Sequence, residues 1–275
     1  MNDIADRRRT FRLLHEQGCF VIPNAWDVGS ALFLKSLGFK ALATTSAGAA
    51  WTMGHADGRT PRDEMLAHIA SIVGATDLPV NADFERGYAH EPQDVAEAVR
   101  RCVETGVAGL SIEDFTGDRE RPLYDIDQAV ARVRAARAAI DASGADVLLV
   151  GRTEGLLRNR PDFDDVLRRL VAYSGAGADC LFAPGLATRE QIVRVVESVA
   201  PKPVNVLVGA PSPLTVKDLA DLGVRRISVG AALARAAWGG FMRAARQIAE
   251  RGTFDGLADA ARGAELNELL GAPRR

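Results

Sequence analysis

Short apolar runs and amphipathic stretches alternate along the whole of the 275-residue chain. The apolar runs are nearly continuous, as in strands that are covered on both faces of a sheet. Each run is followed by a stretch with the period of a helix. Eight such repeats predict an α/β protein of the (β/α)8 TIM-barrel class. The predicted strands cover residues 19–23, 40–45, 78–80, 109–114, 146–152, 180–183, 203–208 and 226–229.

The strand–helix pattern continues without an internal linker, so residues 1–275 are predicted to form one barrel domain. A charged amphipathic helix is expected within 1–18, and alanine-rich helices are expected in a C-terminal extension over 231–275. Thr60 is expected to cap a helix that begins at Pro61. A doubly wound open sheet is the alternative fold, but no G-x-G-x-x-G motif follows the first strand.

Some basic residues on the predicted helices are expected to face solvent. Arg132, Arg134 and Arg137 are assigned to the outer face of one helix. His15 and His68 are assigned to helix surfaces, and neither is expected to take part in chemistry.

Polar side chains gather where the predicted strands end. Barrel enzymes build their sites at the carboxyl ends of the strands, so these side chains are expected to converge. They are Asn24, Ser46, Asn81, Asp83, Glu85, Glu113, Asp114, Arg152, Glu154, Asn205 and Ser228.

Oxygen donors dominate this set, and it contains no histidine or cysteine. Such donors suit Mg²⁺ or Mn²⁺ better than zinc. A structural network of acids and arginines is the alternative. If a metal occupies the acids, Arg152 lacks a protein partner, and an anion of the substrate should meet it.

Composition and charge exclude some classes of partner and indicate a cellular compartment. The formal net charge of −2 argues against nucleic acid or an anionic membrane as a partner. The three cysteines are widely spaced and fit a reducing compartment better than a disulfide framework. No apolar run approaches the length of a membrane span, and no secretory signal is recognised at the start of the chain. A cytoplasmic location is therefore expected.

Several motifs at the predicted strand ends resemble one family. They are N-A-D-F-E-R-G-Y around Asp83, S-I-E-D around Glu113, G-R-T-E around Arg152, T-T-S-A-G over 44–48, Asp57 after His55, and P-V-N-V-L-V around Asn205. In this order the chain resembles the isocitrate lyase/phosphoenolpyruvate mutase superfamily. The resemblance implies a barrel enzyme that holds a 2-oxo acid with Mg²⁺ and reacts through an enolate. It also implies a homo-oligomer, a tetramer or a dimer, in which the C-terminal helix is exchanged between subunits.

The resemblance assigns roles to individual residues. The implied substrate-binding residues are Thr45, Ser46, Ala47, Gly48, Asp83, Arg152 and Asn205. The implied metal ligands are Asp83, Asp57, Glu113 and Asn81. The implied catalytic residues are Arg152, Glu113 and Asp57, with Arg152 stabilising the enolate oxygen or a carboxylate.

Two features depart from the family pattern. The first acid of the family's D-x-D pair is Asn81 here, which removes an anionic ligand and should weaken Mg²⁺ binding. The loop over 115–124 has none of the cysteine, histidine or lysine of the family's K-K-C-G-H motif, and it lacks the lysine–asparagine pattern of the mutases. Isocitrate lyase and phosphoenolpyruvate mutase activities themselves are therefore not expected.

Three functions stay open at this point. The leading hypothesis is a Mg²⁺-dependent lyase, decarboxylase or hydrolase that acts on a small 2-oxo acid, such as an oxaloacetate-like or 2-oxoglutarate-like dicarboxylate. The second is a phosphonate enzyme that cleaves or rearranges a P–C bond. The third is a 2-oxo acid binding protein without catalysis.

Overall fold

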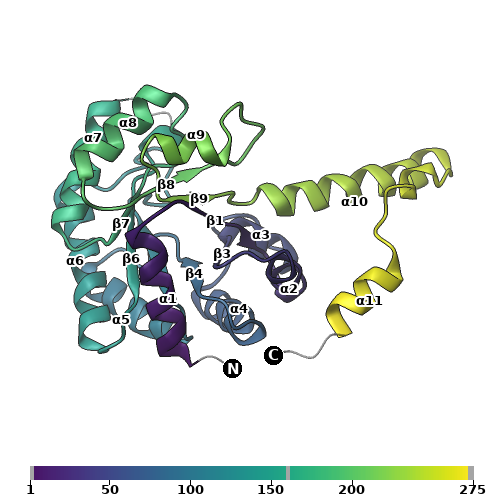
Figure 1. The fold of residues 1–275 in the computed structure, drawn as a ribbon, viewed down its shortest axis with the longest axis horizontal. Helices are drawn as coiled ribbons and strands as arrows, with labels where there is room; N and C mark the ends of the chain where they lie inside the picture. Colours follow the sequence, from purple (N-terminus) through teal and green to yellow (C-terminus); the bar gives the residue numbers. More distant parts are fainter. Residues whose placement is uncertain (1–2, 159–161, 272–275) are drawn as a thin grey trace.

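Parallel strands form a nearly closed barrel in the computed structural model, which describes residues 3–158 and 162–271. The nine strands lie in the order β1-β9-β8-β7-β6-β5-β4-β3-β2, and all neighbours are parallel. The TIM-barrel prediction is confirmed, and helices surround the strands (Figure 1). The strands are β1 (Phe20–Ile22), β2 (Asn24–Ala25), β3 (Leu42–Thr44), β4 (Val80–Asp83), β5 (Gly109–Glu113), β6 (Leu148–Arg152), β7 (Cys180–Phe182), β8 (Val204–Leu207) and β9 (Arg226–Ser228).

The first predicted strand, over 19–23, corresponds to β1, and Pro23 separates it from a further short strand, β2. Proline has no backbone N–H to donate, so it interrupts the ladder. The carbonyl of Pro23 still accepts a hydrogen bond from the backbone N–H of Ala43 at 2.9 Å. Because β1 pairs with β9 and β2 pairs with β3, the interrupted strand closes the ring.

The helices follow the strands as predicted, with two additions, α3 and the short 3-10 helix η1. A short helix, α3, begins directly after β3, where the sequence suggested only a connection. The helices are α1 (Ile4–Glu16), α2 (Val28–Ser36), α3 (Ser46–Thr52), α4 (Arg62–Ala75), α5 (Pro92–Glu104), α6 (Ile126–Ala142), η1 (Gly155–Arg158), α7 (Phe163–Gly175), α8 (Arg189–Val199), α9 (Val216–Asp221), α10 (Ala232–Arg251), η2 (Asp255–Leu257) and α11 (Gly263–Gly271).

Helix α1 closes the amino-terminal end of the barrel. Phe11 is fully buried there in a small apolar cluster with Ile22, Ala43 and Leu148. His15 lies in the same region, so its predicted place on the surface is wrong. Burial, together with the nearby positive charge of Arg226, lowers the pKa of His15 to about 3.

Two other placements are wrong. Thr60 does not cap α4, because Pro61 precedes the helix and the buried hydroxyl of Thr60 has no hydrogen-bond partner. Arg132 is buried rather than outward-facing. Its guanidinium donates to the carbonyls of Arg86, Ala89 and His90, which explains why α6 tolerates a buried cation.

The C-terminal segment leaves the barrel. Helix α10 projects away from it, and the chain then turns back through η2 and α11 (Figure 1). The predicted helix over 254–270 is therefore two separate pieces. The arm formed by α10, η2 and α11 exposes large apolar side chains, including Trp238, Phe241 and Phe254. Among the described helices, none is both long and apolar enough to cross a membrane.

Candidate active site

A cavity of about 160 Å³ lies at the carboxyl ends of the strands. It is a small space, equivalent to the share of about five water molecules in the liquid. Most of the residues predicted for substrate or metal binding line it. They are Thr45, Ser46, Ala47, Asp57, Asn81, Asp83 and Arg152.

Three predicted residues contribute in other ways. Glu113 contacts Arg152 instead of lining the cavity. Asn205 is buried beside the cavity and bonds to other polar side chains. Gly48 donates its N–H to the hydroxyl of Thr45 at 3.3 Å. A Cβ atom at Gly48 would lie 2.8 Å from the Cβ of Trp26, so this glycine is needed for close packing.

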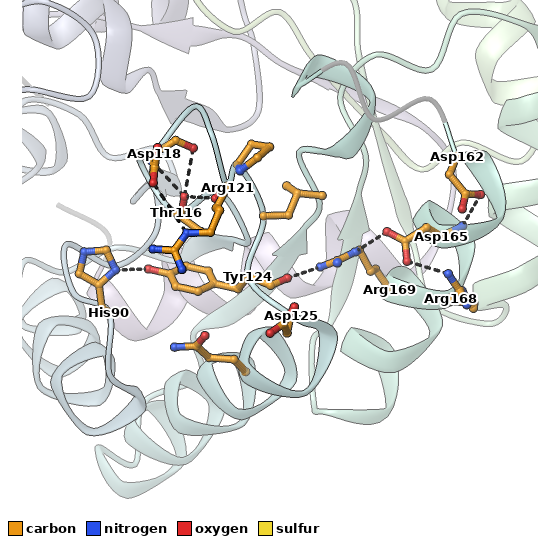
Figure 2. A pocket seen from close by; sticks show the side chains of 13 residues that line it. His90, Thr116, Asp118, Arg121, Tyr124, Asp125, Asp162, Asp165, Arg168 and Arg169 are labelled. Carbon is orange, nitrogen blue, oxygen red and sulfur yellow. Dashed lines mark hydrogen bonds and ion pairs between the residues drawn. The ribbon is translucent and has the colours of Figure 1, made fainter.

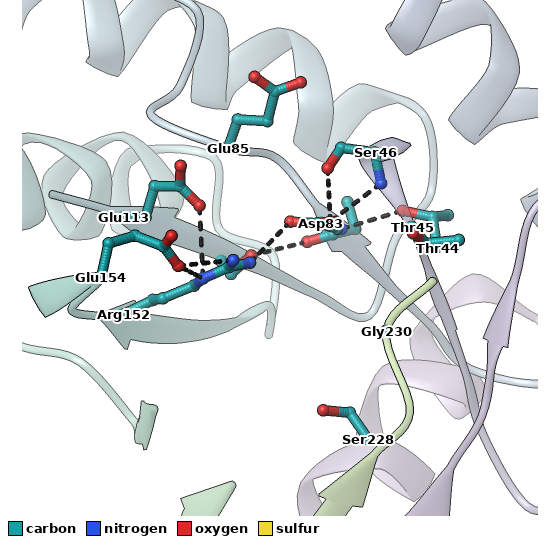
Figure 3. Close-up of polar contacts among 12 residues, drawn as sticks. Thr44, Thr45, Ser46, Asp83, Glu85, Glu113, Arg152, Glu154, Ser228 and Gly230 are labelled. Atoms are coloured by element: carbon teal, nitrogen blue, oxygen red, sulfur yellow. Dashed lines mark hydrogen bonds and ion pairs between the residues drawn. The ribbon is translucent and has the colours of Figure 1, made fainter. Parts of the chain in front are cut away.

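Four charged side chains form one network at the mouth of the barrel, and we call it the rim cluster: Asp83, Glu113, Arg152 and Glu154. The Arg152 guanidinium lies 3.2 Å from Asp83, 3.3 Å from Glu113 and 2.6 Å from Glu154. Figure 3 shows Arg152 held between these carboxylates. In this structure Arg152 therefore has three protein partners, as in the alternative of a structural network of acids and arginines.

Strand register brings the rim cluster together. Glu113 and Arg152 are direct neighbours across β5 and β6. Glu154 follows two residues later and also contacts Arg158, at 3.2 Å. Burial alone would lower the pKa of Arg152, but Glu154, Glu113 and Asp83 raise it above its ordinary value.

Asp83 is held from both sides. One carboxylate oxygen accepts the backbone N–H of Ser46 at 2.9 Å and its hydroxyl at 2.8 Å. The other faces Arg152. The backbone N–H of Asp83 donates to the hydroxyl of Thr44 at 2.9 Å. Ser46 thus bonds to a protein carboxylate at the place where the sequence predicted a substrate carboxylate.

Several carboxyl groups around the cavity retain protons more readily than usual. Burial, with the charge of Asp83, raises the pKa of Asp57. Burial raises the pKa of Glu113 well above its ordinary value, although Arg152 opposes this. Burial raises the pKa of Glu85 to about 7. Carboxyl groups with raised pKa values in a cleft are candidates for proton transfer.

Asp114 follows Glu113 but belongs to a different network. Its carboxylate accepts hydrogen bonds from Thr153 at 2.8 Å and from Tyr173 at 2.7 Å, and it lies 3.2 Å from Arg169. Tyr173 and Arg169 are on α7, so Asp114 attaches that helix to the barrel.

Deeper in the barrel, three polar side chains meet beneath the rim cluster, and we call them the floor cluster: Asn81, Asn205 and Arg226. The Arg226 guanidinium donates to the amide oxygen of Asn205 at 3.0 Å and to that of Asn81 at 3.3 Å. Arg226 and Asn81 both line the cavity. A Cβ atom at Gly109 would lie 2.8 Å from the Asn81 oxygen, so this glycine leaves room for the cluster.

Sequence reasoning missed Arg226 because it stands at the start of a strand. Side chains alternate across a strand, so Arg226 shares the inward face with Ser228, which was recognised. Asn81 and Asp83 are also two residues apart on β4, so both face the inside of the barrel, with Asn81 deeper. Alternation was the signal that could have revealed this residue.

A larger cavity of about 1000 Å³ lies elsewhere, between the loop over 116–125 and helices α6 and α7. Figure 2 shows the Tyr124 hydroxyl directed at His90, 2.6 Å away, and Arg169 reaching Asp165 and the Tyr124 carbonyl. No residue of the rim or floor cluster lines this cavity. The small cavity is therefore the better candidate for catalysis.

The sequence was also compared with known proteins. The family model described as Phosphoenolpyruvate phosphomutase matches residues 11–249. The chain belongs to this family. A solved structure described as a lyase/mutase from Burkholderia cenocepacia superposes with a TM-score of 0.95 at 46% identity, over 98% of this chain and 99% of that one.

Two relatives extend the comparison of this phosphoenolpyruvate phosphomutase family member. An uncharacterised Mycobacterium tuberculosis protein is 36% identical over 80% of this chain and 81% of its own length. An oxaloacetate decarboxylase of Paraburkholderia xenovorans is 31% identical over 82% of this chain and 75% of its own. The recognition of the superfamily is thereby confirmed, and its named enzymes are lyases or mutases.

The resemblance implied a divalent metal, and the donor set can be tested against it. Within residues 3–158 and 162–271, no group of three or more His, Cys, Asp or Glu side chains is arranged to hold a metal ion. Asp83 and Glu113 are turned toward Arg152, and Asn81 bonds to Arg226. In this arrangement the predicted ligands do not fit a bound Mg²⁺ or Mn²⁺ ion.

Proposed function

We propose that this family member cleaves a carbon–carbon bond of a small 2-oxo acid through an enolate, as a lyase, decarboxylase or hydrolase. The observation that carries the proposal is that Arg152 contacts Glu113, whose pKa is raised, beside a small cavity that is also lined by Asp57, whose pKa is raised as well. The relative from Paraburkholderia xenovorans, named as an oxaloacetate decarboxylase, supports a 2-oxo dicarboxylate as the substrate class.

In a decarboxylation of this kind, the bond between C3 and the departing carboxylate breaks. Its electron pair moves toward the C2 carbonyl and forms an enolate, while CO₂ leaves. Arg152 lies where it can stabilise the enolate oxygen, and the acids of the rim cluster hold its guanidinium in place. Asp57, which lines the cavity with a raised pKa, is the proposed acid that then protonates C3.

The proposal is tested by turnover of a panel of 2-oxo acids, including oxaloacetate, in excess Mg²⁺ and separately in EDTA. Asp57→Asn should lower kcat by about 10²–10⁴-fold, because it removes the proposed proton donor. Asp127→Asn, a matched change at an exposed aspartate, should leave turnover unchanged. Absence of turnover for every acid in both conditions would overturn the proposal.

Cleavage of a P–C bond is the second candidate. It is favoured by the match to the family described as Phosphoenolpyruvate phosphomutase. Adding 3-phosphonopyruvate to the panel separates the two, since only a phosphonate enzyme releases or transfers its phosphorus.

The C-terminal arm suggests self-association. Its exposed Trp238 and Phe241 contact each other at a ring-centroid distance of 5.4 Å, and monomers rarely expose such apolar surface. A homo-oligomer that exchanges this arm accounts for the exposure. Light scattering should then give a mass above 29.4 kDa, and Phe241→Glu should lower it.

A further inference from the structure

The floor cluster contains a buried positive charge that is paired only with neutral amides. Arg226 is 3% exposed, and its bonding partners are the side-chain oxygens of Asn81 and Asn205. Arg152, at the mouth of the same cavity, has three carboxylate partners. The two arginines therefore differ in the charge that surrounds them.

No acid compensates Arg226 anywhere in the described part of the chain. The ion pairs found there do not include it, and Cys180 is the one titratable group whose charge would favour its protonated form. His15 lies near it as well and would repel it if protonated. Arginine keeps its proton in proteins, so it cannot escape the cost of burial by becoming neutral.

An isolated buried ion is unfavourable unless something pairs with it. Arg226 lines the cavity, so a ligand there can supply the missing anion. The residue at position 81 affects the net charge around Arg226, because the Asn81 side-chain oxygen lies 3.3 Å from the Arg226 guanidinium. An aspartate at this position would pair with Arg226 and cancel the charge, whereas the amide leaves it available.

The charges around the cavity also indicate how a bound substrate would be oriented. The rim cluster combines one guanidinium with three acids, of which Glu154 is shared with Arg158. The mouth is therefore not cationic overall, and the floor is the place where an anionic group gains most. A substrate that enters from the rim would place its charged end at the floor and its reactive carbon nearer Asp57.

We propose that Arg226, with the amides of Asn81 and Asn205, binds an anionic group of the substrate, a carboxylate or a phosphonate, at the base of the cavity. The proposal rests on the proposed function for the identity of the substrate as a 2-oxo acid. Arg226 would thereby supply a fixed positive charge beside position 81, where the family pattern has an acid and this chain has an amide.

The test is a calorimetric titration with oxalate and, separately, with inorganic phosphate, both in EDTA. Oxalate probes a carboxylate site and phosphate probes a site for a tetrahedral anion. Arg226→Met should weaken binding of the preferred anion about 10- to 100-fold, as expected for loss of hydrogen bonds from a charged group. Arg225→Met is the matched control, because Arg225 donates to the Gly18 carbonyl and does not line the cavity.

Asn81→Asp provides a second variant that does not depend on removing the arginine. It places an internal carboxylate beside Arg226 and should weaken anion binding by a similar factor while keeping the protein folded. If Asn81→Asp leaves anion binding unchanged and instead creates Mg²⁺ binding, position 81 is a metal position and the proposal is overturned.

The remaining outcomes are also decisive. Wild-type protein that binds neither anion at millimolar concentration, or Arg226→Met protein that binds both normally, would refute the anion site. Binding that depends on Arg226 without turnover of any 2-oxo acid would uphold the site and refute the proposed function. Turnover of a 2-oxo acid by Arg226→Met protein with an unchanged KM would uphold the proposed function and refute the anion site.

Discussion

Two arginines approach the same cavity from different depths, and their surroundings are opposite. Arg152 of the rim cluster contacts three carboxylates, while Arg226 of the floor cluster contacts two amides. Burial would lower the pKa of both. Carboxylates reverse this for Arg152, whereas the pKa of Arg226 stays lowered. The comparison shows that an arginine available to an anionic ligand is identified by its lack of carboxylate partners. Its distance from the end of the strand does not identify it.

Replacing each arginine in turn should have the largest effects and tests directly whether the two differ in their charge partners. Arg152→Met leaves Asp83, Glu113 and Glu154 without their common partner, and breaking a buried pair typically costs about 3–5 kcal/mol. Arg226→Met removes an uncompensated ion but also leaves the amide oxygens of Asn81 and Asn205 without their donor, so its net cost should be smaller than that of Arg152→Met. The free energy of unfolding in urea at pH 8 measures both effects.

Arg225→Met controls for the change in net charge at a neighbouring position. Equal losses of stability in Arg152→Met and Arg226→Met would show that the floor cluster holds a compensated charge after all. Because three carboxylates contact Arg152, its removal is expected to lower stability as well as activity.

The second prediction uses pH and concerns Glu85, which lies beside the rim cluster (Figure 3). Burial raises the pKa of Glu85 from 4.5 to about 7 in the folded protein. Between these values the folded state holds a proton that the unfolded chain has released. Raising the pH through this window therefore favours unfolding, by about 3 kcal/mol in total for a shift of this size.

Glu85→Gln should abolish the loss of stability that the wild type shows as the pH rises from 4.5 to 7. The variant and the wild type should have similar unfolding free energies near pH 4.5, and the variant should be more stable above pH 7. Glutamine can still accept the hydroxyl of Tyr88, which lies 2.8 Å from Glu85. Glu16→Gln, at an exposed position, should leave the slope unchanged. A wild-type slope that persists in Glu85→Gln would assign the titration to another acid, with Glu113 the first to examine.

The sequence predicted most of the barrel because buried parallel strands leave continuous apolar runs. It predicted the rim residues because carboxylates at strand exits interrupt those runs abruptly. It did not predict α3, since its small residues after Thr45 have no apolar periodicity. It also misplaced Arg132 on an outer helix face, and it overlooked Arg226, which stands at the start of a strand and not at its end. Only three-dimensional partners, carbonyls for one and amides for the other, permit these two to be buried.

The third prediction compares one hydroxyl that bonds to the rim cluster with one that bonds to the floor cluster, and it has the smallest effects. Ser46 donates its hydroxyl to the Asp83 carboxylate at 2.8 Å, whereas the Ser228 hydroxyl accepts from the Asn205 amide at 2.9 Å. Hydrogen bonds to charged groups contribute about 1.5–3 kcal/mol and neutral ones about 0.5–1.5 kcal/mol. Ser46→Ala should therefore lower the free energy of unfolding more than Ser228→Ala does.

The bond at Ser228 joins two groups that do not titrate, so the cost of Ser228→Ala should be the same at pH 8 and pH 4. Urea unfolding at both values gives the comparison. A cost for Ser228→Ala that depends on pH would mean that the floor cluster responds to a titrating neighbour, such as His15 or Cys180, both of which interact with Arg226. The contrast between a charge-compensated rim and an uncompensated floor would then depend on the protonation of that neighbour.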